Sequence, residues 1–312
     1  MAERFQPEKV LPPIMATLFL LFVATQFPPL LVMIGVLIPV PLIFAYIQLG
    51  RRPGITLLAL VFIVLFAMLG PKQAILFFTE YAVLAGIMAE TIRLRLPFDK
   101  CILLSTFVSA IFFIILLFFI LIDRESTLTE FFQGQIKGYF EQSMEALKTM
   151  GNSDDLKVMR EFSNKVSGSL AKLYPSLIIV GVFITAVINY YTIRFLWGRV
   201  YDVNLFHSAR FSEWVLSDKM LWVFISSSGL SFLFDNTLGD IALNVLFITL
   251  ISYFLQGLAI LVYFLESRNV SVFFWVPIFF VIVFQPLLIG AAIGLGIFDV
   301  WMDIRKIRGS EG

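Results

Sequence analysis

The sequence predicts an all-α protein, a polytopic bundle of transmembrane helices with a helical hairpin outside the membrane. Composition is the first reason: 59% of the 312 residues are hydrophobic and 14% are charged, whereas soluble domains average roughly 45–50% apolar and ~25% charged residues. The second reason is the grouping of apolar residues into uncharged runs of about 18 or more, the length that crosses a bilayer. The third is that only one long polar stretch, near residues 123–173, separates these runs.

The spans follow from the length of each run. The stretch 270–304 would form a helix of ~52 Å at 1.5 Å per residue, while the bilayer core needs only ~30 Å. We therefore divide it into two short spans that meet near Pro286, which gives ten spans in total, with nine as the alternative. The other eight are expected at about 11–26, 30–49, 55–70, 73–92, 101–122, 174–197, 220–236 and 241–265.

Basic residues occur in alternate loops and so predict the orientation. The loops "QFPP", "GPKQ" and "FDNTLGD" hold one lysine between them. Because basic loops stay in the cytoplasm, both termini are expected there, in a bacterial inner membrane. Ten spans fit this pattern, whereas nine would leave the basic C-terminus outside. The basic positions are Arg51, Arg52, Arg93, Arg95, Lys100, Arg194, Arg199, Arg210, Lys219, Arg305, Lys306 and Arg308.

Three regions result from this topology. Residues 1–122 form a five-span region, 123–173 an extracytoplasmic hairpin, and 174–312 a region of four or five spans with a basic tail. Thr127 and Glu130 have capping-box spacing at the start of the hairpin. Each of its two helices carries one apolar stripe. The stripes either pack on each other, or the hairpin is a lid or lies on the bilayer surface.

Composition excludes several kinds of chemistry. The net charge of +1 gives no signal for nucleic acid. One cysteine and one histidine exclude cysteine clusters and two-histidine zinc motifs. The chain has no phosphate-binding motif of the form G-x-x-x-x-G-K-[ST], so ATP-driven transport would require a separate ATPase partner. We expect no metal, no cofactor and no enzymatic activity.

Glu80 is the first candidate site residue. It lies only ~4 Å along the axis from the centre of the span 73–92. A charged group at that depth costs about 2.5–3.5 kcal/mol on insertion scales, so it usually faces a cavity or a partner. Glu80 is either a ligand for a substrate amine, a cation or a proton, or a structural anchor for Asn189 or Tyr190.

The other candidates are Pro39, Asn189 and Tyr190. Pro39 and Pro41 in the middle of 30–49 free backbone carbonyls and break or kink the helix, as occurs in the cavity-lining helices of transporters. Asn189 and Tyr190 place polar groups within the span 174–197. A kink that serves packing, and an interfacial aromatic belt, are the alternatives.

Several further patterns indicate structural roles. Glu90 and Arg93 have the i, i+3 spacing of a helix-surface ion pair. Gly290 and Gly294 form a GxxxG pattern typical of a helix-packing seam. "FDNTLGD" suits a turn with helix caps better than a cation site, and Asp299 is expected to pair with Arg305 or Lys306.

The motifs "IPVPLIFAYIQLGRRPG", "GIMAETIR", "FSEWVLSDKMLWVFI" and "GLGIFDVWMDIRK", in this order, resemble the YybS-like family of uncharacterised bacterial membrane proteins. The first half is more distantly similar to the substrate-binding S components of energy-coupling-factor transporters, which borrow ATPase partners. S components usually have six spans, so this chain departs from them by about four spans and the hairpin.

Two functions follow from the sequence. The first is binding or transport of a small-molecule substrate in a pocket near Glu80, Pro39, Asn189 and Tyr190. The second is a non-transport scaffold or regulator that acts through the hairpin and the cytoplasmic loops. In either case the lipid bilayer is a partner and nucleic acid is not.

Overall fold

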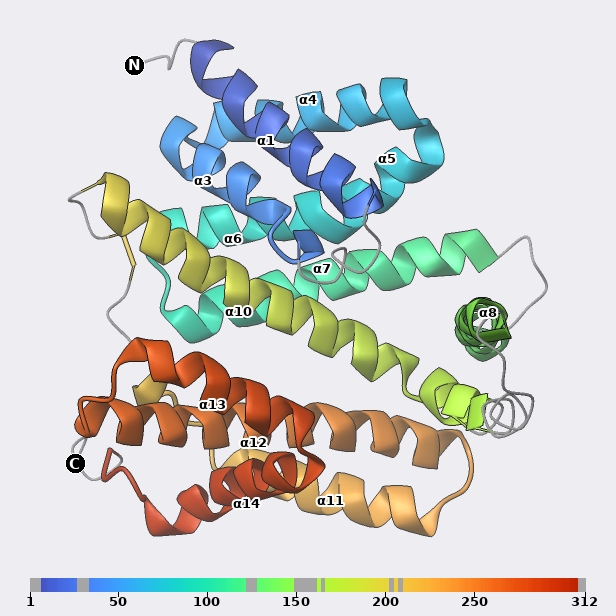
Figure 1. The fold of residues 1–312 in the computed structure, drawn as a ribbon, viewed down its shortest axis with the longest axis vertical. Coiled ribbons are helices and arrows are strands. Elements are labelled where there is room, and N and C mark those ends of the chain that lie inside the picture. Colours follow the sequence, from blue (N-terminus) through green and yellow to red (C-terminus); the bar gives the residue numbers. More distant parts are fainter. Residues whose placement is uncertain are drawn as a thin grey trace. The chain divides into compact units, whose positions relative to one another are not determined.

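The computed structural model describes residues 7–26, 34–121, 128–148, 162–163, 166–201, 205–206 and 210–307. Every element within these ranges is a helix, which confirms the predicted all-α class (Figure 1). Five described helices are long and apolar enough to cross a membrane: Arg51–Leu69, Pro71–Arg93, Phe98–Ile120, Tyr174–Val200 and Thr237–Ser267. Three shorter apolar helices, at Pro12–Val23, Pro39–Leu49 and Lys219–Leu233, coincide with three more of the expected spans.

The contacts divide the chain into two compact units, residues 1–128 with 178–208 and residues 129–177 with 209–312. All but the first four residues of the predicted span 174–197 thus group with the N-terminal helices, whereas the sequence placed the span in the C-terminal region. Each unit is described separately below.

The first unit is built around α3 (Pro39–Leu49) and α6 (Val83–Arg93). α3 packs against α1 (Pro7–Gln26), α4 (Arg51–Leu69) and α6, while α6 also packs against α7 (Phe98–Leu121). α5 (Pro71–Phe77), the π-helical turn η1 (Phe78–Ala82) and α6 follow each other without a break and form one apolar stretch. Ala82, Ala85 and Ala89 are at most 2% exposed, so the small-residue face of this stretch is a packing surface.

The second unit contains α8 (Leu128–Lys148), the short η2 (Phe211–Glu213), α11 (Lys219–Leu233), α12 (Thr237–Ser267), α13 (Val272–Phe284) and α14 (Pro286–Met302). α12 is its centre and packs against α11, α14 and η2. Asn236 caps the start of α12, since its Oδ1 accepts hydrogen bonds from the N–H groups of Leu238 and Gly239. The predicted turn with a helix cap at "FDNTLGD" is therefore confirmed.

The predicted break near Pro286 is also present. α13 ends at Phe284, α14 begins at Pro286, and the two helices are bent by 101°. Pro286 fits the first turn of a helix but cannot donate a hydrogen bond to the preceding turn. The lengths of α13 and α14 and the bend between them fit three arrangements: one broken span, two short spans or a re-entrant loop.

The predicted packing seam at Gly290 and Gly294 is wrong. A Cβ added at either glycine meets no atom of the described residues within 4 Å. The close approach lies at Gly296 and Ala292 of α14, which face Tyr253 and Gly257 of α12, and a Cβ at Gly257 or Gly296 would overlap the opposing backbone. The small residues that matter are again four apart, but they lie on the nearly opposite face of the helix. Spacing alone does not decide between these faces.

The described part of the predicted hairpin favours packing between its stripes. The ring of Phe140 in α8 contacts that of Phe162 edge-on at 6.2 Å, and Phe132 stacks on Tyr174 at 4.6 Å. Thr127, the predicted cap of the first hairpin helix, lies outside the described residues, as does His207, the one histidine of the sequence.

Candidate functional site

The second predicted span is discontinuous, as the prolines suggested. Residues 36–38 form a turn, and α3 begins at Pro39 in its first turn. The N–H of Val40 donates to the Leu37 carbonyl rather than continuing an α-helix to Val36. The Val36 carbonyl is thus released from helical bonding within an apolar segment, where an unpaired carbonyl is costly.

Asn189 of α10 (Tyr174–Val200) binds the released carbonyl. Its Nδ2 donates to the Val36 oxygen at 2.7 Å and to the Thr185 oxygen, also at 2.7 Å. The side chain is fully buried, and its Oδ1 has no hydrogen-bond partner among the described residues. Two of the predicted site residues, Pro39 and Asn189, therefore belong to one local arrangement.

Tyr190 faces a different environment. It is 1% exposed, and its ring contacts Phe98 at 5.0 Å, Phe206 at 5.4 Å and Tyr191 at 5.8 Å, each close to edge-on. Such contacts between aromatic rings stabilise packing. Tyr190 is adjacent to Asn189 in the sequence, but its side chain belongs to an aromatic cluster with Phe98, Tyr191 and Phe206.

Glu80 lies in the π-helical turn, a feature that the sequence did not predict. Its side chain is exposed on the surface of the first unit, within hydrogen-bonding reach of the Tyr81 hydroxyl. Asn189, considered as its partner, instead binds the Val36 and Thr185 carbonyls. Single π-helical turns occur frequently at functional sites. The backbone conformation at Glu80 is therefore a second reason, besides its carboxylate, to keep this residue as a candidate.

Glu90, by contrast, forms ion pairs and a hydrogen bond with neighbouring helices. Arg93 Nη1 lies 3.3 Å from its Oε2, which confirms the predicted i, i+3 pair, and Arg51 Nε lies 3.8 Å from its Oε1. The Tyr46 hydroxyl donates to the same carboxylate at 3.3 Å. These contacts join the ends of α3, α4 and α6.

The second unit contains a buried ion pair. Asp299 Oδ2 and Arg305 Nη2 are 2.8 Å apart, and both side chains are at most 2% exposed. Gln256 of α12 donates to the same oxygen at 2.9 Å, and Arg305 Nη1 donates to the Ser212 carbonyl at 2.6 Å. The predicted pairing of Asp299 with Arg305 is confirmed, and the network joins α12, α14, η2 and the chain after α14.

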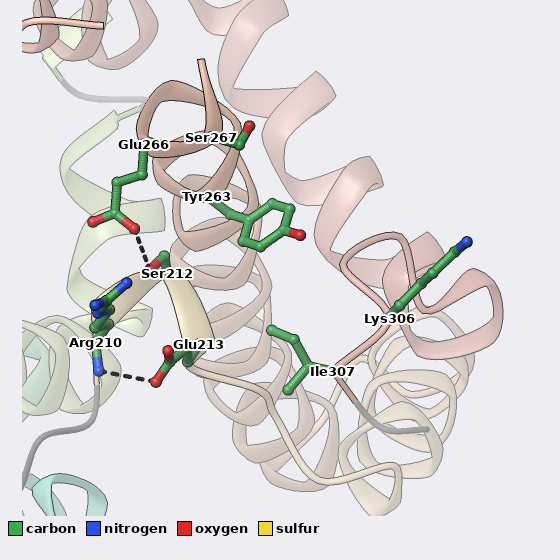
Figure 2. A pocket seen from close by; sticks show the side chains of 8 residues that line it. All are labelled: Arg210, Ser212, Glu213, Tyr263, Glu266, Ser267, Lys306 and Ile307. Carbon is green, nitrogen blue, oxygen red and sulfur yellow. Dashed lines mark hydrogen bonds between the residues drawn. The ribbon is translucent and has the colours of Figure 1, made fainter. Parts of the chain in front are cut away.

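A surface pocket of about 510 Å³ lies next to this network. Figure 2 shows Arg210 and Glu213 on the η2 segment, Tyr263 and Glu266 on α12, and Lys306 on the C-terminal segment. The Ser212 hydroxyl donates to Glu266 at 2.7 Å, and the Arg210 N–H donates to Glu213 at 3.4 Å. Ser267 and Ile307 complete the lining. Among the described residues no group of three histidine, cysteine or acidic side chains could hold a metal.

The comparisons with known proteins agree with this architecture. The model of the family described as "Predicted membrane protein (DUF2232)" matches residues 14–300. The chain belongs to this family. No curated protein and no solved structure matches the chain. The protein is therefore a multi-pass membrane protein of the DUF2232 family.

The region shared with the DUF2232 family contains Pro39, Glu80, Asn189 and Tyr190, but it ends before Arg305 and Lys306. Sequence reasoning missed Gln256, Ser212 and Glu266 as parts of the second unit's network. Gln256 alone carried a signal, because an amide within an apolar span of α12 needs a partner. Ser212 and Glu266 are 54 positions apart, and nothing local indicates that they meet.

Proposed function

We propose that this protein binds a small polar solute within its membrane region and moves it across the bilayer. The observation that carries the proposal is the broken helix before Pro39, together with the buried Asn189 that bonds to the released Val36 carbonyl. Discontinuous helices at membrane depth are typical of the substrate sites of transporters.

Asn189 supplies the recognition chemistry of this proposal. Both hydrogens of its amide group are used by backbone carbonyls, whereas Oδ1 has no partner in the described part of the chain. A buried acceptor of this kind favours a solute with an N–H or O–H donor. Because Asn189 is fully buried, the solute gains access only when the segment before Pro39 moves, and a helix break provides such a hinge.

Glu80 is the second group in the proposed path. A carboxylate in the middle of an apolar span, on a π-helical turn, suits a coupling proton, a cation or a substrate amine. Glu80 and Asn189 act at separate stages in this scheme, one at the surface of its unit and one in the interior.

We also infer that the chain is YybS-like and distantly related to S components, with an inner-membrane location, cytoplasmic termini and no enzymatic activity. The absence of a phosphate-binding motif from the sequence then assigns ATP hydrolysis, if transport uses it, to a separate ATPase.

The test is to release and identify the small molecules that copurify with the protein, by mass spectrometry. Asn189→Leu should reduce the bound solute by about tenfold, the cost of one lost hydrogen bond to a buried partner. The matched control is Asn244→Leu, because Asn244 also bonds two backbone carbonyls. Glu80→Gln is measured in parallel. Equal solute content in the Asn189→Leu and wild-type proteins would remove Asn189 from the site.

The scaffold function keeps one observation in its favour. None of the α8 side chains that the structure describes is buried, so these side chains are at least partly accessible to a protein partner. Removal of residues 128–148 should then abolish partner binding while solute content stays unchanged.

A further inference from the structure

One face of α4 combines exposed arginines with exposed apolar side chains. Arg51 and Arg52 begin the helix, and both side chains are exposed. Following Arg52, the same face presents four further exposed side chains, which we call the apolar stripe: Ile55, Ala59, Ile63 and Phe66. These positions recur at intervals of three or four residues, so they share one face of the helix with Arg52. The buried residues of α4 lie on the opposite face.

The arginines at this end of α4 outnumber the carboxylates near them. Arg51 Nε lies 3.8 Å from Glu90 Oε1, and Arg93 Nη1 lies 3.3 Å from Oε2 of the same carboxylate. One negative charge is thus shared by two guanidinium groups. Arg52 forms no salt bridge with a carboxylate in the part of the chain that the structure describes. Glu80 is about 15 Å farther along the helix axis from Glu90, so positive charge is in excess here.

A buried tyrosine fixes the start of α4 beside the end of α6. The ring of Tyr46 on α3 is 4% exposed and lies against Gly54 of α4, where an added Cβ would overlap the ring. The Tyr46 hydroxyl donates to Glu90 Oε2 at 3.3 Å. The same carboxylate contacts Arg51 and Arg93. Side chains presented on such a frame need little reorganisation to bind a ligand.

The length of α4 places its first residues at the depth of the lipid head groups. Its 19 residues give a helix of about 28 Å, close to the ~30 Å of a bilayer core. It is one of the described helices that are long and apolar enough to cross a membrane. Arg51 and Arg52 therefore lie where phosphates are, and the apolar stripe lies where acyl chains are. A single phospholipid supplies both groups.

We propose that this face of α4 binds an anionic phospholipid. Arg51 and Arg52 bind the phosphate, Arg93 adds positive potential, and an acyl chain lies along the apolar stripe. Guanidinium groups suit phosphate oxygens because they present several N–H donors in a planar fork and form charge-assisted hydrogen bonds. The excess positive charge favours a head group with a net negative charge over a zwitterionic one, which brings its own ammonium. The site does not depend on solute transport.

The test is native mass spectrometry of the full chain, purified in detergent and depleted of lipid. The probes are phosphatidylglycerol, phosphatidylcholine and soluble sn-glycerol 3-phosphate. Phosphatidylglycerol should bind about tenfold more tightly than phosphatidylcholine, because its head group has no ammonium to oppose the arginines. Glycerol 3-phosphate should bind at least about tenfold more weakly than phosphatidylglycerol, because it has no acyl chain for the apolar stripe.

Two variants and one control decide whether the arginines of α4 are responsible. Arg52→Gln should lower the affinity for phosphatidylglycerol about fivefold, and Arg51→Gln with Arg52→Gln more than about tenfold. Both residues are exposed, so the fold should be retained, which size-exclusion chromatography verifies. The matched control is Lys72→Gln, because Lys72 is also exposed but lies just beyond the opposite end of α4, and it should leave the affinity unchanged.

Four results would overturn the proposal. Equal binding of phosphatidylcholine and phosphatidylglycerol would show that the face does not select an anionic head group. Binding of glycerol 3-phosphate as tight as that of phosphatidylglycerol would identify a site for a soluble phosphate instead. Full affinity in the double variant, or an equal loss in Lys72→Gln, would remove the two arginines from the site.

Discussion

Buried and partly exposed ion pairs in this chain contribute differently to the free energy of unfolding. Glu90 is partly accessible, and its carboxylate contacts Arg51, Arg93 and Tyr46. If one of these contacts is lost, the other two and water still stabilise the charge. Asp299 and Arg305 are at most 2% exposed. Breaking a buried pair by removing one partner leaves the other charge without compensation and costs about 3–5 kcal/mol, whereas exposed pairs contribute roughly 0–1 kcal/mol.

Arg305→Met should therefore destabilise the protein by about 3–5 kcal/mol. The cause is the Asp299 charge, which would keep, among the described residues, only Gln256 and the Ile304 N–H as partners. Unfolding in mixed micelles with increasing SDS measures the change. The matched control is Lys172→Met, which removes one partner of the exposed pair with Asp240 and should cost less than about 1 kcal/mol.

The double variant Arg305→Met with Asp299→Leu extends this test. It removes both charges, so it should recover part of the stability lost in Arg305→Met alone. A single variant as stable as the wild type would show that this ion pair contributes nothing to the fold.

Between helices, the closest contact of the second unit depends on two glycines. A Cβ at Gly257 would overlap the Ala292 carbonyl, and a Cβ at Gly296 would overlap the Tyr253 carbonyl. Gly257→Ala and Gly296→Ala should each destabilise α12 and α14 by about 1–3 kcal/mol, because the backbones must move apart. Chemical unfolding of the purified variants measures this effect.

Gly290→Ala and Gly294→Ala are the controls on the same helix. Their added methyl groups meet no described residue within 4 Å, and alanine is favoured over glycine in a helix by about 0.5–1 kcal/mol. They should be neutral or slightly stabilising. Equal losses at all four positions would contradict the assigned packing face.

These elements show which features the sequence could predict. The helix starts at Pro39 and Pro286 were predictable, because proline acts locally through its ring and its missing N–H. The pairing of Asp299 with Arg305 joins residues six apart and was also predictable. The packing face of α14 was predicted incorrectly, since GxxxG spacing identifies small residues but not the partner helix. The π-helical turn at Glu80 has no sequence signature that we can name.

For the whole molecule, the candidate sites depended on contacts that the sequence does not reveal. Asn189 and Val36 are 153 positions apart, and Gln256 and Asp299, which also share a hydrogen bond, are 43 apart. The sequence indicated that Asn189 needed a partner, because an amide in an apolar span is costly. It could not choose between Glu80 and a released carbonyl, since that choice depends on how helices from distant parts of the chain pack.

The last pair of helices decides the topology of the whole molecule. α13 has 13 residues and α14 has 17, so their lengths are about 20 Å and 26 Å, each below the ~30 Å of a typical bilayer core. If they are two spans, Gln285 reaches the side opposite Arg268, and both termini share one side. If they form a re-entrant loop, Gln285 stays within the membrane and the ends of the pair share one side, whereas one broken span places Gln285 within the membrane and the two ends on opposite sides.

Labelling of single cysteines distinguishes these arrangements, because Cys101 is the only native cysteine and is buried. In a Cys101→Ala background, we expect Gln285→Cys to react with a membrane-impermeant maleimide from the outside of intact cells, as does the control Asp235→Cys. Arg268→Cys should react only after the cells are opened. Since Asp235 and Arg268 flank the long helix α12, they must report opposite sides in any arrangement. Protection of position 285 in both intact and opened cells would exclude the ten-span topology, because position 285 lies within the membrane in a re-entrant loop and in one broken span alike.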